Sequence, residues 1–252
     1  MFPTIPIGPL RLQTYGMVLL LAYLAGLWLA ARQARRHGLT SDHAYNAGFY
    51  ALLVGIVAAR LGHALAYAEI YRAEPLQLLS FSPGAFLLLP GVLGAVGMAA
   101  IYIRRHRLPA ARMVDIFAPG IVLALAIANL GAFLAGRDLG ALSNLPWAVE
   151  LFGVRRHPVA LLQALALLVL LGGLLWADRR ATLRPGQLAL LGLFGYATIR
   201  LFLEPLRAES PLVAGGWRLA QIVALGVVLV SGWLLGRMAG APEKPVQGEA
   251  DT

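Results

Sequence analysis

Seven long apolar runs dominate the sequence, and they constrain the fold more than any other feature. Most of them reach about 18 residues or more, the length that crosses a bilayer as a helix. Charged residues make up only 13% of the chain, about half the share usual in soluble domains. Short alternating segments, which would indicate a β-barrel, are absent. We therefore predict an all-α polytopic membrane protein with a single transmembrane domain over residues 1–238. The predicted spans are 15–33, 44–68, 85–103, 114–135, 158–177, 187–203 and 217–237.

The charges between these runs indicate an orientation. The formal net charge is +9, and all but one of the basic residues are arginine. Arginines gather in the connections after the first, third and fifth spans, whereas the alternate connections are less basic, with 136–157 as the exception. The positive-inside rule then places the N-terminus outside and the C-terminus in the cytoplasm. Topology explains the basic charge, so no nucleic-acid partner is implied. We expect residues 239–252 to form a disordered cytoplasmic tail.

Several polar side chains fall inside the apolar runs, where they are costly and are candidates for function. Arg200 and Glu204 are spaced to pair on one helix face. With the predicted orientation, the charged members lie toward the outer surface and suggest a pocket for an anionic lipid head group, since the arginine fork suits phosphate. The alternatives are arginines that extend to the interface, and Asn129 as a hydrogen bonder between helices. These candidates are Arg60, His63, Asn129, Arg137, Arg200, Glu204 and Arg207.

Six segments, in order from about residue 2 to 238, together resemble one known family. They are "IGPLRLQTYG" with Tyr15, "ARLGHALAY" with Arg60 and Gly62, "VDIFAPGI" with Asp115 and Pro119, "RHPVALLQ", "GYATIRLFLEPLR", and "LAQIVAL" with Gln221. In these features the chain resembles the prolipoprotein diacylglyceryl transferase family of the bacterial plasma (inner) membrane.

The resemblance implies a reaction and a set of residues. The family transfers the diacylglyceryl group of phosphatidylglycerol to the thiol of a lipobox cysteine in an exported prolipoprotein. The chain itself has no cysteine, but the substrate brings the thiol. No metal or organic cofactor is implied. Candidates for catalysis are Arg200 and Glu204, which match the family's pattern, with Arg137 as a substitute cation. Candidates for binding phosphatidylglycerol, or another anionic lipid, are Arg60, Arg207, Tyr15, Asn129, His63 and Gln221.

The chain departs from the family's pattern at several polar positions. In "NLGAFLAGRDLG", residues 129–140, the glycine skeleton remains, but Asn129 stands for an arginine and Arg137 for a glutamate. Leu89 stands where the family has a histidine, and Gln163 where it has a glutamate. Two hypotheses follow: an active transferase, or a non-catalytic relative (a pseudoenzyme) that serves as a lipid-binding or structural subunit of a membrane complex. Without internal symmetry, a transporter is less favoured.

Overall fold

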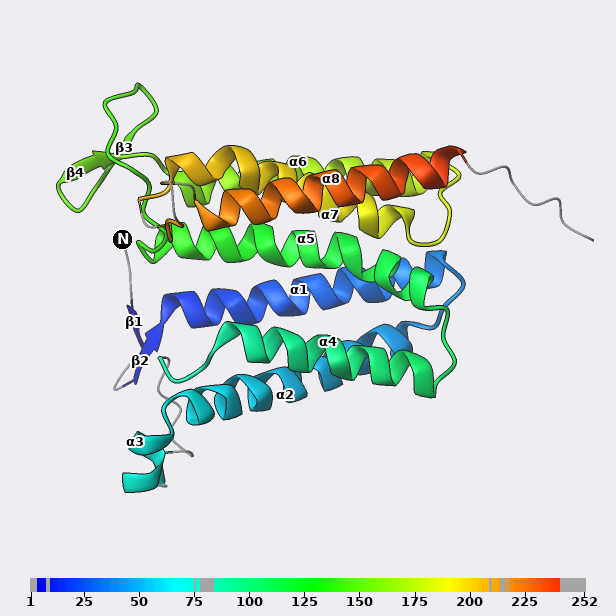
Figure 1. Cartoon of the computed structure of the whole chain (residues 1–252), viewed down its shortest axis with the longest axis horizontal. Coiled ribbons are helices and arrows are strands. Elements are labelled where there is room, and N and C mark those ends of the chain that lie inside the picture. Colours follow the sequence, from blue (N-terminus) through cyan, green and yellow to red (C-terminus); the bar gives the residue numbers. More distant parts are fainter. Residues whose placement is uncertain are drawn as a thin grey trace, which may run out of the picture. The chain divides into compact units, whose positions relative to one another are not determined.

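The computed structural model describes residues 4–7, 10–74, 76–77, 84–208, 210–213, 216 and 218–240. Within them, seven helices are long and apolar enough to cross a membrane. Figure 1 draws these helices as labelled ribbons. The predicted all-α class and the seven spans are confirmed. These helices are α1 (Thr14–Arg36), α2 (Ser41–Ala66), α4 (Leu88–Arg105), α5 (Ala110–Leu134), α6 (Val159–Arg180), α7 (Gln187–Leu203) and α8 (Leu219–Gly240).

The remaining elements are short. Helix α3 (Ala68–Ala73) follows α2, and a 3-10 turn, η2 (Glu204–Leu206), continues α7. Strands β1 (Thr4–Ile7) and β2 (Leu10–Gln13) form one antiparallel hairpin, and β3 (Val149–Leu151) and β4 (Val154–Arg156) form another. In Figure 1 the β3–β4 hairpin extends beyond the start of α6.

The helices group into two compact units, residues 27–120 and residues 1–26 with 121–252. The single transmembrane domain and the membrane orientation therefore stay predictions. The predicted tail lies almost wholly outside the described residues, which end at Gly240 in α8.

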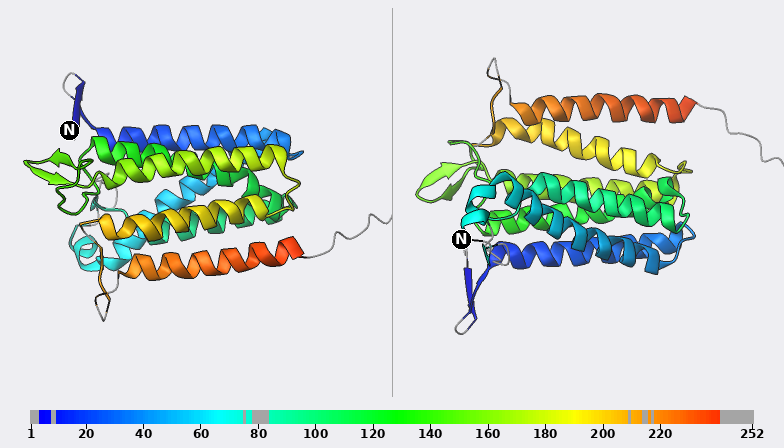
Figure 2. Two further views of the ribbon diagram at one scale, coloured as in Figure 1. Left: turned by 90° about the horizontal axis from the view of Figure 1, so that it is seen from above. Right: turned by 60° about the horizontal axis from the view of Figure 1, so that its bottom comes forward.

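Small residues let α2 and α4 pack closely in the unit of residues 27–120. A Cβ built on Gly55 would lie 3.2 Å from the carbonyl oxygen of Gly91, and one on Gly94 only 2.5 Å from Cβ of Ala58. Such approach of backbones is the usual role of small residues in membrane helices. Figure 2 shows the two helices side by side. The core beside them is formed by Ala31, Ala34, Ala44, Ala47, Tyr102, Met113 and Ile116.

The other unit is built around α7, which contacts both α6 and α8 (Figure 1). Gly195 of α7 faces Leu170 of α6, and an added Cβ would lie 2.4 Å from the leucine side chain. Gly131 of α5 likewise packs against Val18 of α1, and an added Cβ would lie 2.5 Å from the valine side chain. These contacts pack α7 against α6 and α1 against α5.

Candidate functional site

Helix α5 ends in an ordered cap that a glycine makes possible. The amide of Arg137 donates to the carbonyl of Ala132 (2.8 Å), and the amide of Gly136 donates to that of Phe133 (3.1 Å). These two bonds form a Schellman motif, which requires a left-handed residue after the C-cap. Gly136 supplies it with φ of 68°. The stretch 129–140 is therefore first of all a helix end, and Asp138 lies two residues beyond Gly136, outside the helix.

Gly140, four residues further on, allows chain segments from three helices to meet. A Cβ at Gly140 would lie 2.1 Å from the carbonyl oxygen of His157, so no other residue fits without moving the backbone. The amide of His157 donates to the carbonyl of Ala141 (3.1 Å), and Gly140 forms an antiparallel bridge with Arg207. The segment after α5 is thus tied to the segment before α6 and to the segment after α7.

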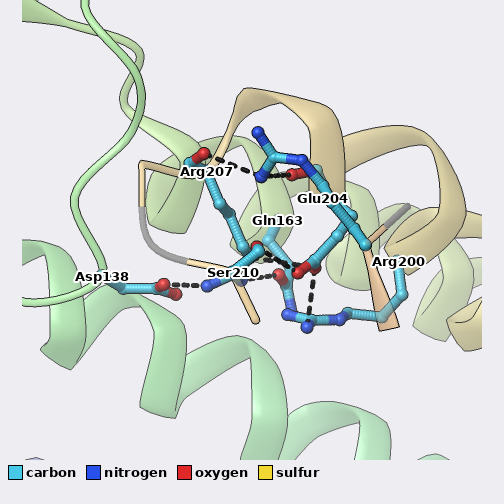
Figure 3. A network of polar contacts seen from close by, with 7 residues as sticks. Asp138, Gln163, Arg200, Glu204, Arg207 and Ser210 are labelled. Carbon is cyan, nitrogen blue, oxygen red and sulfur yellow. Dashed lines mark hydrogen bonds and ion pairs between the residues drawn. The ribbon is translucent and has the colours of Figure 1, made fainter. Parts of the chain in front are cut away.

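Arg207 lies at the centre of the network that this meeting creates (Figure 3). Its guanidinium donates to the carboxylate of Asp138 and, over 2.5 Å, to Oε1 of Gln163. Only 8% of Arg207 is exposed. Burial lowers the pKa of Arg207 from its ordinary value, because desolvation disfavours the charged form. The two oxygen partners compensate this desolvation, since a buried charge is tolerated only when it is paired and hydrogen-bonded.

Glu204 holds Arg200, near the end of α7, in place. Its Oε2 lies 2.8 Å from a terminal nitrogen of Arg200, the pairing that the four-residue spacing predicts. Its Oε1 accepts a 2.6 Å hydrogen bond from the hydroxyl of Ser210, and Figure 3 shows all of these side chains converging. Nε of Arg207 is 3.5 Å from the same Oε2, which is too long for a good hydrogen bond. Glu204 is 2% exposed, so it serves as an internal anchor.

The arginines of this network differ in access to a ligand. The side chain of Arg200 is 24% exposed, against 10% for Arg207. Arg218, at the start of α8, donates to the backbone carbonyls of Glu204 and Arg207, each over 2.9 Å. Three cations therefore meet two carboxylates, those of Glu204 and Asp138, and the network keeps a positive balance. Arg200 therefore has a more exposed side chain than Arg207 and is placed better for an external anion.

Tyr15 and Arg137 are brought together beside the end of α5. The guanidinium carbon of Arg137 lies 4.7 Å from the centre of the Tyr15 ring, a cation–π contact. The packing of Val18 into Gly131 sets this distance, since it fixes the first turn of α1 against the last turns of α5. Two residues implied by the family resemblance thus lie in one contact, although 122 positions separate them in the sequence.

Arg60 and His63 lie in the other unit and have local partners there. Arg60 donates to the backbone carbonyls of Ala85 (3.0 Å) and Gln77, and its guanidinium carbon lies 5.7 Å from the ring centre of Tyr71. Nδ1 of His63 is 2.9 Å from the hydroxyl of the same tyrosine. These contacts hold the connection between α2 and α4. Head-group binding by Arg60 and His63 stays a prediction.

Asn129 and Gln221 have simpler surroundings. The Asn129 side chain donates to the carbonyl of Leu125 one turn earlier (2.7 Å), so this bond lies within α5. Gln221 is half-buried in the first turn of α8, and its backbone N–H donates to the carbonyl of Arg218 (3.0 Å). Neither contact tests the lipid-binding role implied for these residues.

The sequence analysis missed several members of the network. Asp138, Ser210 and Arg218 were not singled out, and Gln163 was noted only as a departure from the family pattern. Asp138 carries one usable signal, an acid directly after the glycine-capped end of a span. Gln163 carries none, because its partner Arg207 lies 44 positions away.

These observations define a class first: an integral membrane protein of seven candidate spans with a buried arginine–carboxylate network at the ends of its helices. Residues 3–237 match the family model described as prolipoprotein diacylglyceryl transferase. The chain belongs to that family.

Curated relatives agree over nearly the full length. The phosphatidylglycerol–prolipoprotein diacylglyceryl transferase of Geobacillus kaustophilus is 31% identical, covering 96% of this chain and 95% of its own. That of Bacillus cereus (strain ATCC 14579) is 31% identical, covering 90% of this chain and 88% of its own. That of Corynebacterium efficiens is 27% identical, covering 96% of this chain and 82% of its own.

Proposed function

We propose that this protein transfers the diacylglyceryl group of phosphatidylglycerol to the cysteine thiol of an exported prolipoprotein. The sulfur attacks the glyceryl carbon that carries the phosphate. A carbon–sulfur bond forms and the carbon–oxygen bond to phosphate breaks. Glycerol phosphate leaves with the bonding electron pair, and the thiol proton passes to a base. The single observation that carries the proposal is the anchored Arg200–Glu204–Arg207 arrangement.

Each residue of that arrangement has a proposed role. Arg200 has the most exposed guanidinium and binds the phosphodiester, where it offsets the charge that develops on the departing phosphate. Glu204, fixed by Ser210, orients Arg200. Arg207 is buried and acts as a positioning residue through Gln163 and Asp138. Electrostatic stabilisation of this kind rests on preorganisation, which a network without free rotation supplies.

Arg137 is proposed as the additional cation of the site. Its guanidinium is exposed but held over the Tyr15 ring. A cation held in this way loses less rotational freedom when it meets a phosphate than one on a freely rotating side chain. Tyr15 then orients Arg137 and contributes its hydroxyl to the lipid-facing surface.

The non-catalytic alternative is favoured by one structural observation. Both terminal nitrogens of Arg207 donate hydrogen bonds inside the protein, and Asp138 and Glu204 offset most of the local positive charge. The departures at Leu89 and Asn129 point in the same direction. In that case the protein is a lipid-binding or structural subunit that co-purifies with membrane partners and shows no turnover.

A reconstituted assay separates the two. Purified protein, phosphatidylglycerol and a lipobox peptide are incubated, and released glycerol phosphate is measured beside the Geobacillus kaustophilus relative. The transferase proposal expects release that Arg200→Ala abolishes. The matched control, Arg237→Ala at the far end of α8, removes an equal charge outside the network and retains release. No release by the wild-type protein, under conditions where the relative turns over, overturns the transferase assignment.

A further inference from the structure

A second candidate anion site lies in the unit of residues 27–120, at the end where α1 finishes and α2 begins. There a cavity of about 350 Å³ is lined by Trp28, Ala31, Arg32, Arg35 and Tyr45. Its volume lies within the range of about 300–1,000 Å³ typical of small-molecule sites. None of the residues that line this cavity is a candidate for the proposed transfer reaction, so the inference below does not rest on that reaction.

The two arginines of this cavity are partly oriented. Nε of Arg35 donates to the hydroxyl of Ser41 (2.7 Å), and that hydroxyl lies 3.2 Å from the carbonyl oxygen of Ala31. Within the described part of the chain, the two terminal nitrogens of Arg35 then make no further hydrogen bond. The guanidinium carbon of Arg32 lies 5.6 Å from the centre of the Trp28 ring. Two forks that can bind phosphate oxygens in pairs therefore line one cavity.

The surroundings of the cavity suit a lipid. It is bounded by two helices that are long and apolar enough to cross a membrane. Trp28 and Tyr45 are residues of the kind enriched at the membrane–water interface. From Tyr45 an exposed apolar stripe continues along α2 through Phe49 and Leu53, at spacings of four residues that keep to one helix face. An acyl chain can follow this stripe while the phosphate remains at the arginines.

We propose that this cavity binds the phosphate head group of an anionic phospholipid, with Arg32 and Arg35 as the phosphate ligands. Trp28 and Tyr45 hold the glycerol region at the interface, and the stripe on α2 receives one acyl chain. An electroneutral head group such as phosphocholine binds less well, because its ammonium group faces two cations. The occupant anchors the α1–α2 corner and is not consumed.

The test counts bound lipids on the full-length protein. Protein is reconstituted in nanodiscs of phosphatidylcholine doped with phosphatidylglycerol, and retained lipids are counted by native mass spectrometry. We expect Arg32→Gln with Arg35→Gln to lower the occupancy of one phosphatidylglycerol about tenfold, the effect of a loss of about 1.4 kcal/mol. The matched control is Arg104→Gln with Arg105→Gln, which removes the same charge from the exposed end of α4 in the same unit. It should retain occupancy within about twofold.

Further arms identify the ligand and guard against misfolding. Arg35→Lys keeps the charge but loses the fork, so it should weaken retention if the arginine binds phosphate as proposed. Arg200→Ala should leave this lipid in place, which separates the site from the proposed transfer reaction. Equal losses in the two double variants, equal retention of phosphatidylcholine, or displacement of the lipid by millimolar inorganic phosphate would each overturn the proposal.

Discussion

Removing the charge of Glu204 is the sharpest perturbation that the network offers. Glu204 is 2% exposed and contacts Arg200 at 2.8 Å and Ser210 at 2.6 Å. Glu204→Gln keeps the volume and one carbonyl acceptor but leaves Arg200 and Arg207 without their shared carboxylate. Loss of one partner of a buried ion pair costs about 3–5 kcal/mol. Because Arg200 is partly exposed and water can replace some of the interaction, we expect less than this range, about 2–3 kcal/mol.

This cost should appear in thermal unfolding of the purified protein. In chains of this size, 1 kcal/mol changes the Tm by about 2–4 °C, so we expect Glu204→Gln to melt about 5–10 °C lower. Glu150→Gln, at the exposed position of strand β3, is the matched control and should stay within about 1 °C. A double-mutant cycle with Arg200→Gln should give a coupling of at least about 1 kcal/mol. A Tm equal to that of the control, or a coupling near zero, would refute the assignment of Glu204 as an internal anchor.

Three further substitutions test individual contacts. Gly140→Ala places a Cβ against the carbonyl of His157, so we expect the protein to lose at least about 3 kcal/mol of stability, measured by thermal unfolding. Any transfer activity, measured as glycerol phosphate release, should be lost with it. Gly62→Ala would put its Cβ 2.4 Å from a proline ring of α4, and should lower stability by about 1–3 kcal/mol; an unchanged Tm would contradict the packing. Tyr15→Phe keeps the ring under Arg137, whereas Tyr15→Leu removes it. The leucine variant should therefore be about 0.5–1 kcal/mol less stable than the phenylalanine variant. Equal Tm values for the two variants would exclude the cation–π contact.

The membrane fold could be predicted because a span is specified locally. About 20 consecutive apolar residues are both necessary and recognisable, since every backbone polar group in lipid must be satisfied within its own helix. The predicted run 114–135 and the observed α5, Ala110–Leu134, differ by only a few residues at each end. The Arg200–Glu204 pair is local in the same sense, because four residues along a helix always bring two side chains to one face.

The sequence alone, then, determined the seven spans and the Arg200–Glu204 pair, whose partners lie four residues apart. The tertiary structure decided the rest of the network. Asp138 and Gln163 are 69 and 44 positions from Arg207, and no periodicity links them. Their meeting depends on two glycines with different tasks: Gly136 turns the chain through a left-handed conformation, and Gly140 lets backbones touch. The sequence shows that a glycine is present, but only the folded structure shows which backbone segment packs against it.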